Sequence, residues 1–355
     1  MKTREQLLRE QLAQIEPCAK EYEARSLAYW DTVGKPLKSL GRLEDLITQI
    51  CAIQRSERPM TEKKRLIVMC ADNGVVAEGV TQTGQEVTAV VAENFFDDQT
   101  CTSLMCHEAG CELTVVDIGM AADTPRTLRK KEVYGTKNLA VEPAMTRETA
   151  IGAILTGIEL VRDFAAHGTQ IFATGEMGIG NTTTSSAIAA VLLGVPPEAV
   201  TGRGAGLSSD GLKKKIDAIR RGIAVNSPDP DDPLDVLAKV GGLDIAGLAG
   251  VFLGGALCRC PVVIDGFISA VAALLAKRLA PACAGYMLAS HVSKEPASGM
   301  ILEALGKRAL LTCDMCLGEG SGAVALLPLI DMAARVYNEM GTFADIRVET
   351  YVPLN

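Results

Sequence analysis

Two glycine-rich segments carry the carboxylates that are best placed to do chemistry in this chain. Glu176 lies in residues 175–184 and Glu319 lies in residues 317–322, and each segment follows an apolar run and precedes a helical pattern. A carboxylate held between glycines at the end of a strand is a candidate general base. The alternative for Glu319 is an acidic residue in the first turn of a helix, where it favours the helix dipole.

The segment at residues 175–184 also indicates an anion site. Its glycines permit close approach of the backbone, and free amides at the start of the next helix, helped by hydroxyl groups, can bind a phosphate. The glycine spacing does not match a dinucleotide fingerprint, and the lysine of a Walker loop is missing. A plain glycine turn capped by Asn181 or Thr182 stays open as the alternative.

Further polar clusters follow other apolar runs. Arg203 and the lysines at 213–215 could supply positive charge to a phosphate or carboxylate, although a solvated helix face explains the lysines equally well. Asp265 ends a strongly apolar run, where a carboxylate usually has a partner or a task. Residues 71–88 and 290–296 contain turn residues and a single His, which are more often structural than catalytic.

These segments must be positioned by alternating strands and helices. From Arg65 onward, short apolar runs end in small or acidic residues and are separated by helical patterns; the runs are LIVMCADNG, LTVVDIG, IFATGEMG, PVVIDGF, YMLASHVS and LLTCDMCLGEGSG. Such alternation predicts an α/β fold with a parallel sheet and crossover helices. Ligands of such a sheet bind beyond the carboxyl ends of its strands, where the polar clusters lie.

The two ends of the chain have a different pattern. Helical spacing of apolar residues predicts two or three helices in the first sixty residues, and a long helix followed by an extended tail at the end. We therefore predict an N-terminal helical segment at 1–60, an α/β catalytic domain at 61–322, and a C-terminal helix and tail at 323–355. The two ends could pack together as a small domain. The stretch at 228–233 is a loop too short to link domains.

Composition narrows the class of protein. The 355 residues carry a net charge of −8 without a basic stretch, which argues against nucleic-acid and anionic-membrane partners. The charged opening and the lack of a long apolar run predict a cytoplasmic protein without a signal peptide or a membrane span. The eleven cysteines are expected to be reduced thiols, and with only three His residues we predict no metal site.

Taken in order, these segments resemble the nicotinate-nucleotide:dimethylbenzimidazole phosphoribosyltransferase family. The resemblance extends from Pro36 to Pro328 and rests on residues 71–88, 175–183, 202–215, 241–246, 262–267, 290–296 and 317–322. It implies a Rossmann-like parallel sheet flanked by helices, a small helical domain built from both chain ends, and a homodimer in which the partner's small domain borders each active site.

The resemblance also implies a reaction and its participants. The enzyme would move the 5-phosphoribosyl group from nicotinate mononucleotide to 5,6-dimethylbenzimidazole or a related aromatic base during assembly of the cobamide nucleotide loop. The substrates would be these two small molecules, and no metal or other cofactor would be needed.

Each predicted site residue receives its role from the same resemblance. Glu319 would remove the proton from the attacking base nitrogen, and Glu176 would support the charge that develops at the ribose. The residues expected at the aromatic base are Thr81, Thr83, Gln85, Met177 and Leu317. Those expected at the phosphate and ribose are Gly178, Gly180, Asn181, Thr182, Thr183, Gly202, Lys215, Asp265 and Ser293.

The chain departs from the family pattern at three places. It has Asn73 where the family usually has His, Thr83 and Gly84 where it has Tyr-Pro, and Ala297 and Ser298 where it has Gly-His. The first two departures fall in the segment that is expected to line the base pocket. Losing the Tyr ring predicts a roomier and more polar pocket.

Three other functions stay open. A relative with the same fold could prefer a purine or a phenol as acceptor, a catalytically silent chain could serve as one subunit of a heterodimer, and a nucleotide-binding sensor could use the same phosphate site. The presence of both Glu319 and Glu176 argues against a silent subunit.

Overall fold

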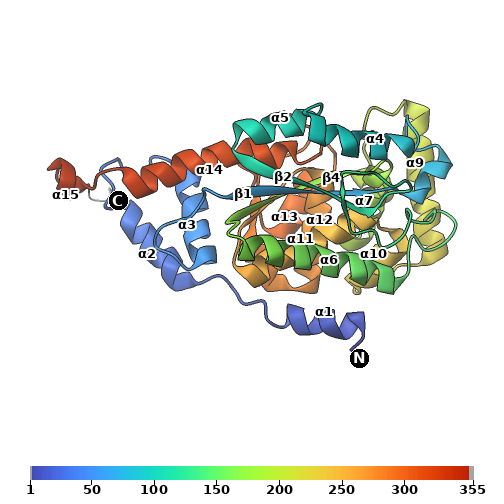
Figure 1. The fold of residues 1–355 in the computed structure, drawn as a ribbon, viewed down its shortest axis with the longest axis horizontal. Coiled ribbons are helices and arrows are strands. Elements are labelled where there is room, and N and C mark those ends of the chain that lie inside the picture. Colours follow the sequence, from blue (N-terminus) through green and yellow to red (C-terminus); the bar gives the residue numbers. More distant parts are fainter. Residues whose placement is uncertain (1, 352–355) are drawn as a thin grey trace.

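The computed structural model describes residues 2–351, and its centre is a parallel sheet of six strands with helices on both faces (Figure 1). The strand order is β3-β2-β1-β4-β5-β6, and every pair is parallel. The strands are β1 (Lys64–Ala71), β2 (Cys111–Gly119), β3 (Leu128–Arg129), β4 (Ile171–Met177), β5 (Val262–Ile264) and β6 (Met287–Ala289). The strands that follow β1 in the chain are added first on one side, as β2 and β3, and then on the other side, as β4, β5 and β6. Sheets of this kind bind ligands in the crevice at such a reversal of strand order, here between β1 and β4. The predicted fold class is therefore confirmed.

The predicted strands are present except for the last one. Residues 310–316 contribute only an isolated bridge between His291 and Leu311. Cys313 and Cys316 are exposed, and Asp314 has a left-handed backbone with φ of 51°. A strand of a parallel sheet is buried on both faces, whereas residues 312–314 are exposed. The sequence also gave no signal for β3, which is two residues long and exposed.

Helices of both faces come from the crossovers between strands. One face is covered by α4 (Glu86–Asn94), α5 (Cys101–Glu108) and α14 (Ser321–Glu339), and the other by α6 (Arg147–Ala166), α11 (Leu243–Cys258) and α12 (Phe267–Leu279) (Figure 1). Other helices surround this core, namely α7 (Asn181–Leu193), α8 (Pro197–Val200), α9 (Ser209–Asn226), α10 (Pro233–Val240) and α13 (Ser298–Leu305). Short 3-10 turns are η1 (Gly74–Glu78), η2 (Phe95–Asp97) and η3 (Pro281–Tyr286).

Glycines bring α6 and α11 into close contact. A Cβ added to Gly157 of α6 would lie 2.2 Å from the carbonyl oxygen of Gly247, and one on Gly250 of α11 would lie 2.1 Å from that of Ile154. The backbones therefore touch where the side chains are absent. The apolar, Gly- and Ala-rich stretches at 245–257 and 266–279 form the buried helices α11 and α12. Among residues 2–351, no helix combines the length and the apolarity that crossing a membrane requires.

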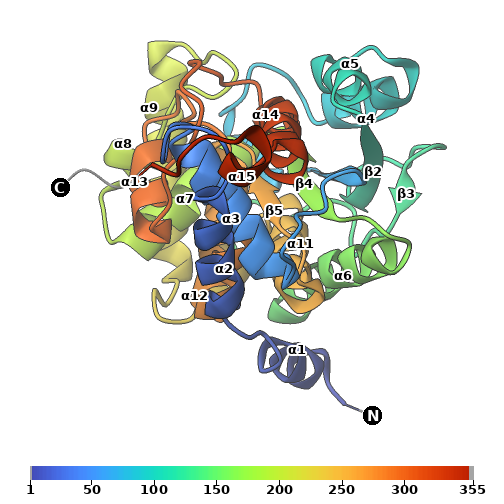
Figure 2. The same ribbon diagram turned by 90° about the vertical axis from the view of Figure 1, so that its left-hand side faces the viewer.

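The two ends of the chain meet at one end of the sheet. Helices α2 (Lys20–Trp30) and α3 (Arg42–Gln54) lie beside the second half of α14 (Figure 2). In the chain, α14 is followed by the short helix α15 (Phe343–Ile346). The ring of Tyr337 contacts Tyr29 and Trp30 with centroids 4.7 and 4.8 Å away, respectively. The predicted tail is therefore partly helical, and residues 352–355 of it lie outside the described residues. The division into domains at residues 60 and 322 stays a prediction.

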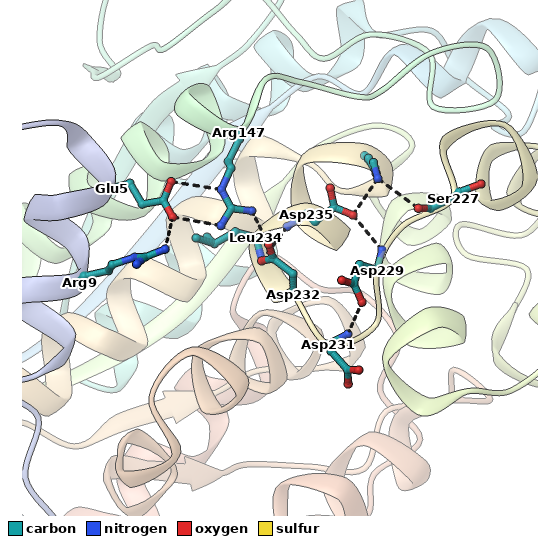
Figure 3. Close-up of polar contacts among 10 residues, drawn as sticks. Glu5, Arg9, Arg147, Ser227, Asp229, Asp231, Asp232, Leu234 and Asp235 are labelled. Carbon is teal, nitrogen blue, oxygen red and sulfur yellow. Dashed lines mark hydrogen bonds and ion pairs between the residues drawn. The ribbon is translucent and has the colours of Figure 1, made fainter.

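The first helix, α1 (Arg4–Leu12), does not join α2 and α3 but lies against α6 (Figures 1 and 2). Arg147 of α6 contacts Glu5 of α1 at 3.2 Å and Asp232 at 2.7 Å (Figure 3). Asp232 ends the predicted loop at 228–233 and caps α10 by accepting from the N–H groups of Leu234 and Asp235. The loop prediction is thus confirmed, and polar contacts at the surface attach α1 to it.

The packing at the chain ends can be tested at Trp30. We expect Trp30→Ala to lower the free energy of unfolding by about 3 to 5 kcal/mol, because it leaves a cavity beside Tyr337. Leu27→Ala on the same helix is the matched control, because Leu27 is 47% exposed and its change should stay within about 0.5 kcal/mol. Urea unfolding followed by circular dichroism measures both variants. Tryptophan fluorescence does not serve here, because Trp30 is the only tryptophan and Trp30→Ala removes it. Equal losses in the two variants would contradict the packing described here.

Candidate active site

A cavity of about 320 Å³ opens where β4, β5 and β6 end. Its wall consists of the segments that follow these three strands, the loop at 316–319, and parts of the segments at 80–83 and 203–207. The wall combines apolar side chains such as Met177, Phe267 and Leu317 with acidic and hydroxyl groups. A small organic molecule with both an apolar and a charged part fits such a lining.

Glu176 enters this cavity from the end of β4 and belongs to a buried acidic pair. The side-chain amide of Asn181 donates to the carboxylates of both Glu176 and Asp244, the second at 3.0 Å. Burial, together with the charge of Asp244, raises the pKa of Glu176 to about 8. Burial also raises the pKa of Asp244 to about 7. Because both carboxylates lie out of water beside each other, they resist being charged together near neutral pH.

Glu319 lies in a turn of unusual backbone conformation directly before α14. Gly318, Glu319 and Gly320 have left-handed φ values of 88°, 61° and 88°. A non-glycine residue in this region costs roughly 1 to 2 kcal/mol, so the surroundings must hold Glu319 there. The turn packs on β4, where a Cβ on Gly175 would lie 2.6 Å from the carbonyl oxygen of Glu319.

The carboxylate of Glu319 faces the cavity and has one polar partner from another element. The hydroxyl of Thr102 on α5 donates to its Oε2 at 3.4 Å. Burial raises the pKa of Glu319 above the usual value, and the contact with Thr102 lowers it. A half-buried carboxylate with one weak hydrogen bond is able to accept a proton from a ligand in the cavity.

The start of α7 builds the part of the cavity wall next to Glu176. This helix begins after Gly180, which has a left-handed φ of 95°, and Asn181 and Thr182 of its first turn line the cavity. Thr182 accepts from the ammonium group of Lys215 at 2.8 Å, and this ammonium group also donates to the carbonyl of Gly202 at 3.2 Å. Burial lowers the pKa of Lys215 to about 8. A helix N-terminus with a cation behind it is suited to an anion.

The structure brings most of the predicted site residues together in the cavity wall. These are Thr81, Thr83, Glu176, Met177, Gly178, Gly180, Asn181, Thr182, Asp265, Ser293, Leu317 and Glu319. Their individual roles stay predictions. The side of Gly178 where a Cβ would sit faces the interior, 2.6 Å from both a carboxylate oxygen of Asp244 and the carbonyl oxygen of Ala71, so the position has no room for a side chain.

Four predicted site residues lie outside this wall. Gln85 donates to the carbonyl of Asn73, and Thr183 is fully buried because the third position of α7 turns inward. Gly202 and Lys215 form a layer behind Thr182. The ambiguity of the three lysines is resolved, because Lys213 and Lys214 are exposed on α9 whereas Lys215 is fully buried.

Several wall residues were not predicted. His291 and Glu295 are in the wall, but a single His or Glu after a strand gives no sign of which way it points. Arg203, which the sequence indicated as a possible source of positive charge, is in the wall as well. Thr102 and Asp244 reach Glu319 and Glu176 only through the packing of α5 and α11. Among residues 2–351, no group of three or more His, Cys, Asp or Glu side chains is arranged to hold a metal ion.

The three departures from the family pattern have different locations. Asn73 is fully buried and its side chain is not part of the cavity wall, whereas the position of the base pocket itself stays a prediction. Thr83 lies at the exposed rim of the cavity, and Gly84 is not part of the wall. Ser298 stands where the family usually has His, and its hydroxyl accepts from the N–H of Ser293 at 3.0 Å.

Comparison with known proteins first defines the class of enzyme. A family model described as a phosphoribosyltransferase matches residues 15–348. The nicotinate-nucleotide–dimethylbenzimidazole phosphoribosyltransferase of Ruminiclostridium cellulolyticum is 48% identical over 91% of this chain and 93% of its own length. The enzyme of the same name from Acetivibrio thermocellus is 47% identical over the same shares.

Solved structures agree with the sequence relatives. The crystal structure of CobT from Thermus thermophilus superimposes with a TM-score of 0.89 at 40% identity and covers 93% of this chain and 100% of that one. This chain therefore belongs to the nicotinate-nucleotide–dimethylbenzimidazole phosphoribosyltransferase family, as the sequence motifs predict.

The buried acidic pair predicts how stability depends on pH. Because folding raises the pKa of Glu176 from about 4.5 to about 8, the folded state keeps a proton that the unfolded chain releases. This contribution makes the free energy of unfolding fall as the pH rises between these values. Between about pH 5 and pH 8, we expect the free energy of unfolding of Glu176→Gln to decrease by about 1 to 3 kcal/mol less than that of the unaltered protein.

Urea unfolding at several pH values measures this difference. Glu339→Gln serves as the control, because Glu339 is exposed and pairs only with Arg335 one turn earlier on α14. The control should have the same pH dependence as the unaltered protein. If Glu176→Gln does so too, the acid pair does not titrate as described.

Proposed function

We propose that this chain transfers the 5-phosphoribosyl group from nicotinate mononucleotide to 5,6-dimethylbenzimidazole or a related aromatic base. The products are nicotinate and an α-ribazole-type 5′-phosphate, which serves the nucleotide loop of a cobamide. The observation that carries this proposal is the carboxylate of Glu319, held in a left-handed turn at the cavity of a chain that belongs to this enzyme family. No metal or redox step is required by the chemistry.

The reaction exchanges one C–N bond for another. A ring nitrogen of the acceptor attacks C1′ of the ribose while the bond from C1′ to the nicotinate nitrogen breaks, and its electron pair neutralises the pyridinium. The proton of the acceptor passes to Glu319, because a protonated azole nitrogen cannot form the bond. Attack from the face opposite the leaving group converts the β-linkage of the donor into an α-linkage.

Glu176 has a role at the donor in this mechanism. Its buried carboxylate is half of an acid pair that shares Asn181, and a cationic pyridinium or a ribose with developing positive charge favours its ionised form. The negative charge then stabilises the transition state at C1′ in a site with little water. This agrees with the role that the resemblance implies for Glu176.

The phosphate and the aromatic base are assigned to different parts of the cavity wall. We assign the phosphate to the first turn of α7 with Asn181 and Thr182, backed by Lys215. The acceptor ring is assigned to the side of Met177 and Leu317, since thioether and aliphatic groups contact aromatic rings well. These assignments place the acceptor nitrogen beside Glu319, which follows Leu317 by two residues.

The activity is tested by chromatography of the purified protein with nicotinate mononucleotide and candidate bases. We expect nicotinate and an α-linked ribazole phosphate in equal amounts. A protein that binds the nucleotide without releasing nicotinate would instead be the sensor or the silent subunit, and release with only a purine or a phenol would identify the relative with another acceptor.

We also propose a homodimer that works in the cytoplasm and binds no nucleic acid. Exposed apolar side chains on two neighbouring helices, Leu104 of α5 and Met332 of α14, support self-association. The eleven cysteines are free, which suits a reducing compartment, and the net charge of −8 disfavours polyanions. Light scattering of the purified protein measures the number of subunits.

The role of Glu319 can be tested by Glu319→Gln. We expect turnover to fall by about two to four orders of magnitude, the usual contribution of a general base, with donor binding retained. In the unaltered enzyme turnover should decrease as the pH falls below the raised pKa of Glu319, because its protonated form cannot accept a proton. Asp314→Asn on the same loop is the control, since Asp314 is exposed and lies outside the cavity wall. Near-normal turnover of Glu319→Gln with a neutral azole would remove Glu319 from this role.

The lack of an aromatic ring at the rim residue Thr83 predicts weak discrimination between acceptors. Without the ring that relatives carry there, each methyl of dimethylbenzimidazole gains less than about 1 kcal/mol, so its preference over benzimidazole should be tenfold or less. Thr83→Tyr should increase this preference, whereas Thr83→Ser, which adds no ring, should not. Competition between the two bases at equal subsaturating concentrations measures it. A preference above about a hundredfold in the unaltered enzyme would show that other walls hold the methyl groups.

A further inference from the structure

The carboxylate of Asp265 is occupied by the backbone at the start of α14. Asp265 follows β5 and is only 3% exposed. Its two oxygens accept from the N–H groups of Gly320 at 3.2 Å, Gly322 at 2.7 Å and Ala323 at 3.0 Å. The N-cap residue of α14 is Gly320, which has no side chain to satisfy these amides. Asp265 therefore caps this helix from another part of the chain.

The same contacts bear on the turn that carries Glu319. The backbone of Gly318, Glu319 and Gly320 is left-handed, and such a conformation persists only where the surroundings determine it. Asp265 fixes the C-terminal side of the turn, and the hydroxyl of Ser321 donates to the carbonyl of Gly318 at 2.8 Å across it. Both contacts hold the peptide groups on either side of Glu319.

His291 closes the space on the other side of Asp265. Its ring lies against Gly322, where an added Cβ would be 2.0 Å from Nδ1. The hydroxyl of Ser290 lies 3.1 Å from the same nitrogen and donates to the backbone carbonyl of Asp265 at 3.0 Å. The carboxylate of Asp265 thus has little freedom to leave the amides of α14.

We propose that Asp265 is a positioning residue for the general base, which holds the turn of Glu319 through its backbone instead of binding the phosphoribosyl group. This inference rests on the proposed function, in which Glu319 takes the acceptor proton. It differs from the expectation that Asp265 is a ribose or phosphate ligand, and it rests on the three backbone N–H groups that donate to the two oxygens of this carboxylate.

A double-mutant cycle with Asp265→Asn and Glu319→Gln tests the proposal. The Asn amide places an N–H group against one of the backbone donors, so the turn should shift. We expect Asp265→Asn alone to lower kcat by about 10- to 100-fold, the cost of misplacing a catalytic group by about 1 Å, while the donor KM changes by less than about threefold. In the Glu319→Gln background the same change should lower kcat by less than about twofold, because a displaced Gln has no base function to lose.

The alternatives give different results in the same cycle. A residue that binds the ribose would raise the donor KM and would cause its full loss in both backgrounds, which would overturn the proposal. A merely structural role would lower the amount of folded enzyme equally in both backgrounds without this coupling. If Glu319→Gln alone leaves kcat unchanged, the base assignment in the proposed function fails. If Glu319→Gln abolishes turnover and the two losses multiply, only the present inference fails.

Two further variants keep the test independent of folding problems. Ser321→Ala removes the contact across the same turn with little change in volume, and we expect a smaller loss of kcat with the same dependence on Glu319. Asp117→Asn is the matched control: Asp117 is a buried carboxylate at the end of β2 that accepts from the N–H of Met120 and pairs with Lys131, away from the cavity. It should lower stability and leave the kcat of the folded enzyme within about twofold. A kcat for Ser321→Ala equal to that of the unaltered enzyme would also overturn the proposal.

Discussion

The contact between the Asp265 carboxylate and the first amides of α14 connects the parts of this protein that matter for its function. α14 starts at the cavity with its N-terminal amides satisfied from β5, covers one face of the sheet, and ends against the helices at the start of the chain. The turn before it holds Glu319, and its far end holds Tyr337 against Trp30. The site and the meeting point of the chain ends therefore share one helix, α14.

A second constraint is the concentration of acids around a site that receives a cationic donor. Burying Glu176 beside Asp244 is unfavourable for two carboxylates, and Asn181 compensates only partly by donating to both. A positively charged ligand in the cavity makes the ionised form of Glu176 more favourable. Beside Asn181 in the first turn of α7, Lys215 lies behind Thr182 and adds positive charge near the amides of this helix, without exposing that charge to the solvent. The site thus combines buried carboxylates with a buried cation, as a substrate with a pyridinium and a phosphate requires.

The strands were predictable wherever burial and apolar sequence coincide. β1, β2 and β4 are long runs that are covered on both faces, and the fold class follows from their alternation with helices. The same reasoning failed at residues 310–316, because apolar composition predicts burial only if another element covers the segment. Glu176 and Glu319 were found because they stand in glycine-rich segments that follow apolar runs. Thr183 lies outside the cavity wall because neighbouring positions at a helix start point in different directions, and the sequence does not say which of them faces the cavity.

The sequence by itself determined the fold class and the two carboxylates of the site, because apolar periodicity and glycine spacing are local properties of the chain. The family followed from the resemblance of its ordered motifs to known proteins. Only the tertiary structure decided that Asp265 holds the start of α14, that Asp244 shares Asn181 with Glu176, and that Thr102 reaches Glu319. It also separated buried Lys215 from its exposed neighbours and placed Asn73 outside the cavity wall. These contacts join residues from different strands and helices. Their formation depends on the strand order and on the packing of α5, α11 and α14 against the sheet, which no local pattern encodes.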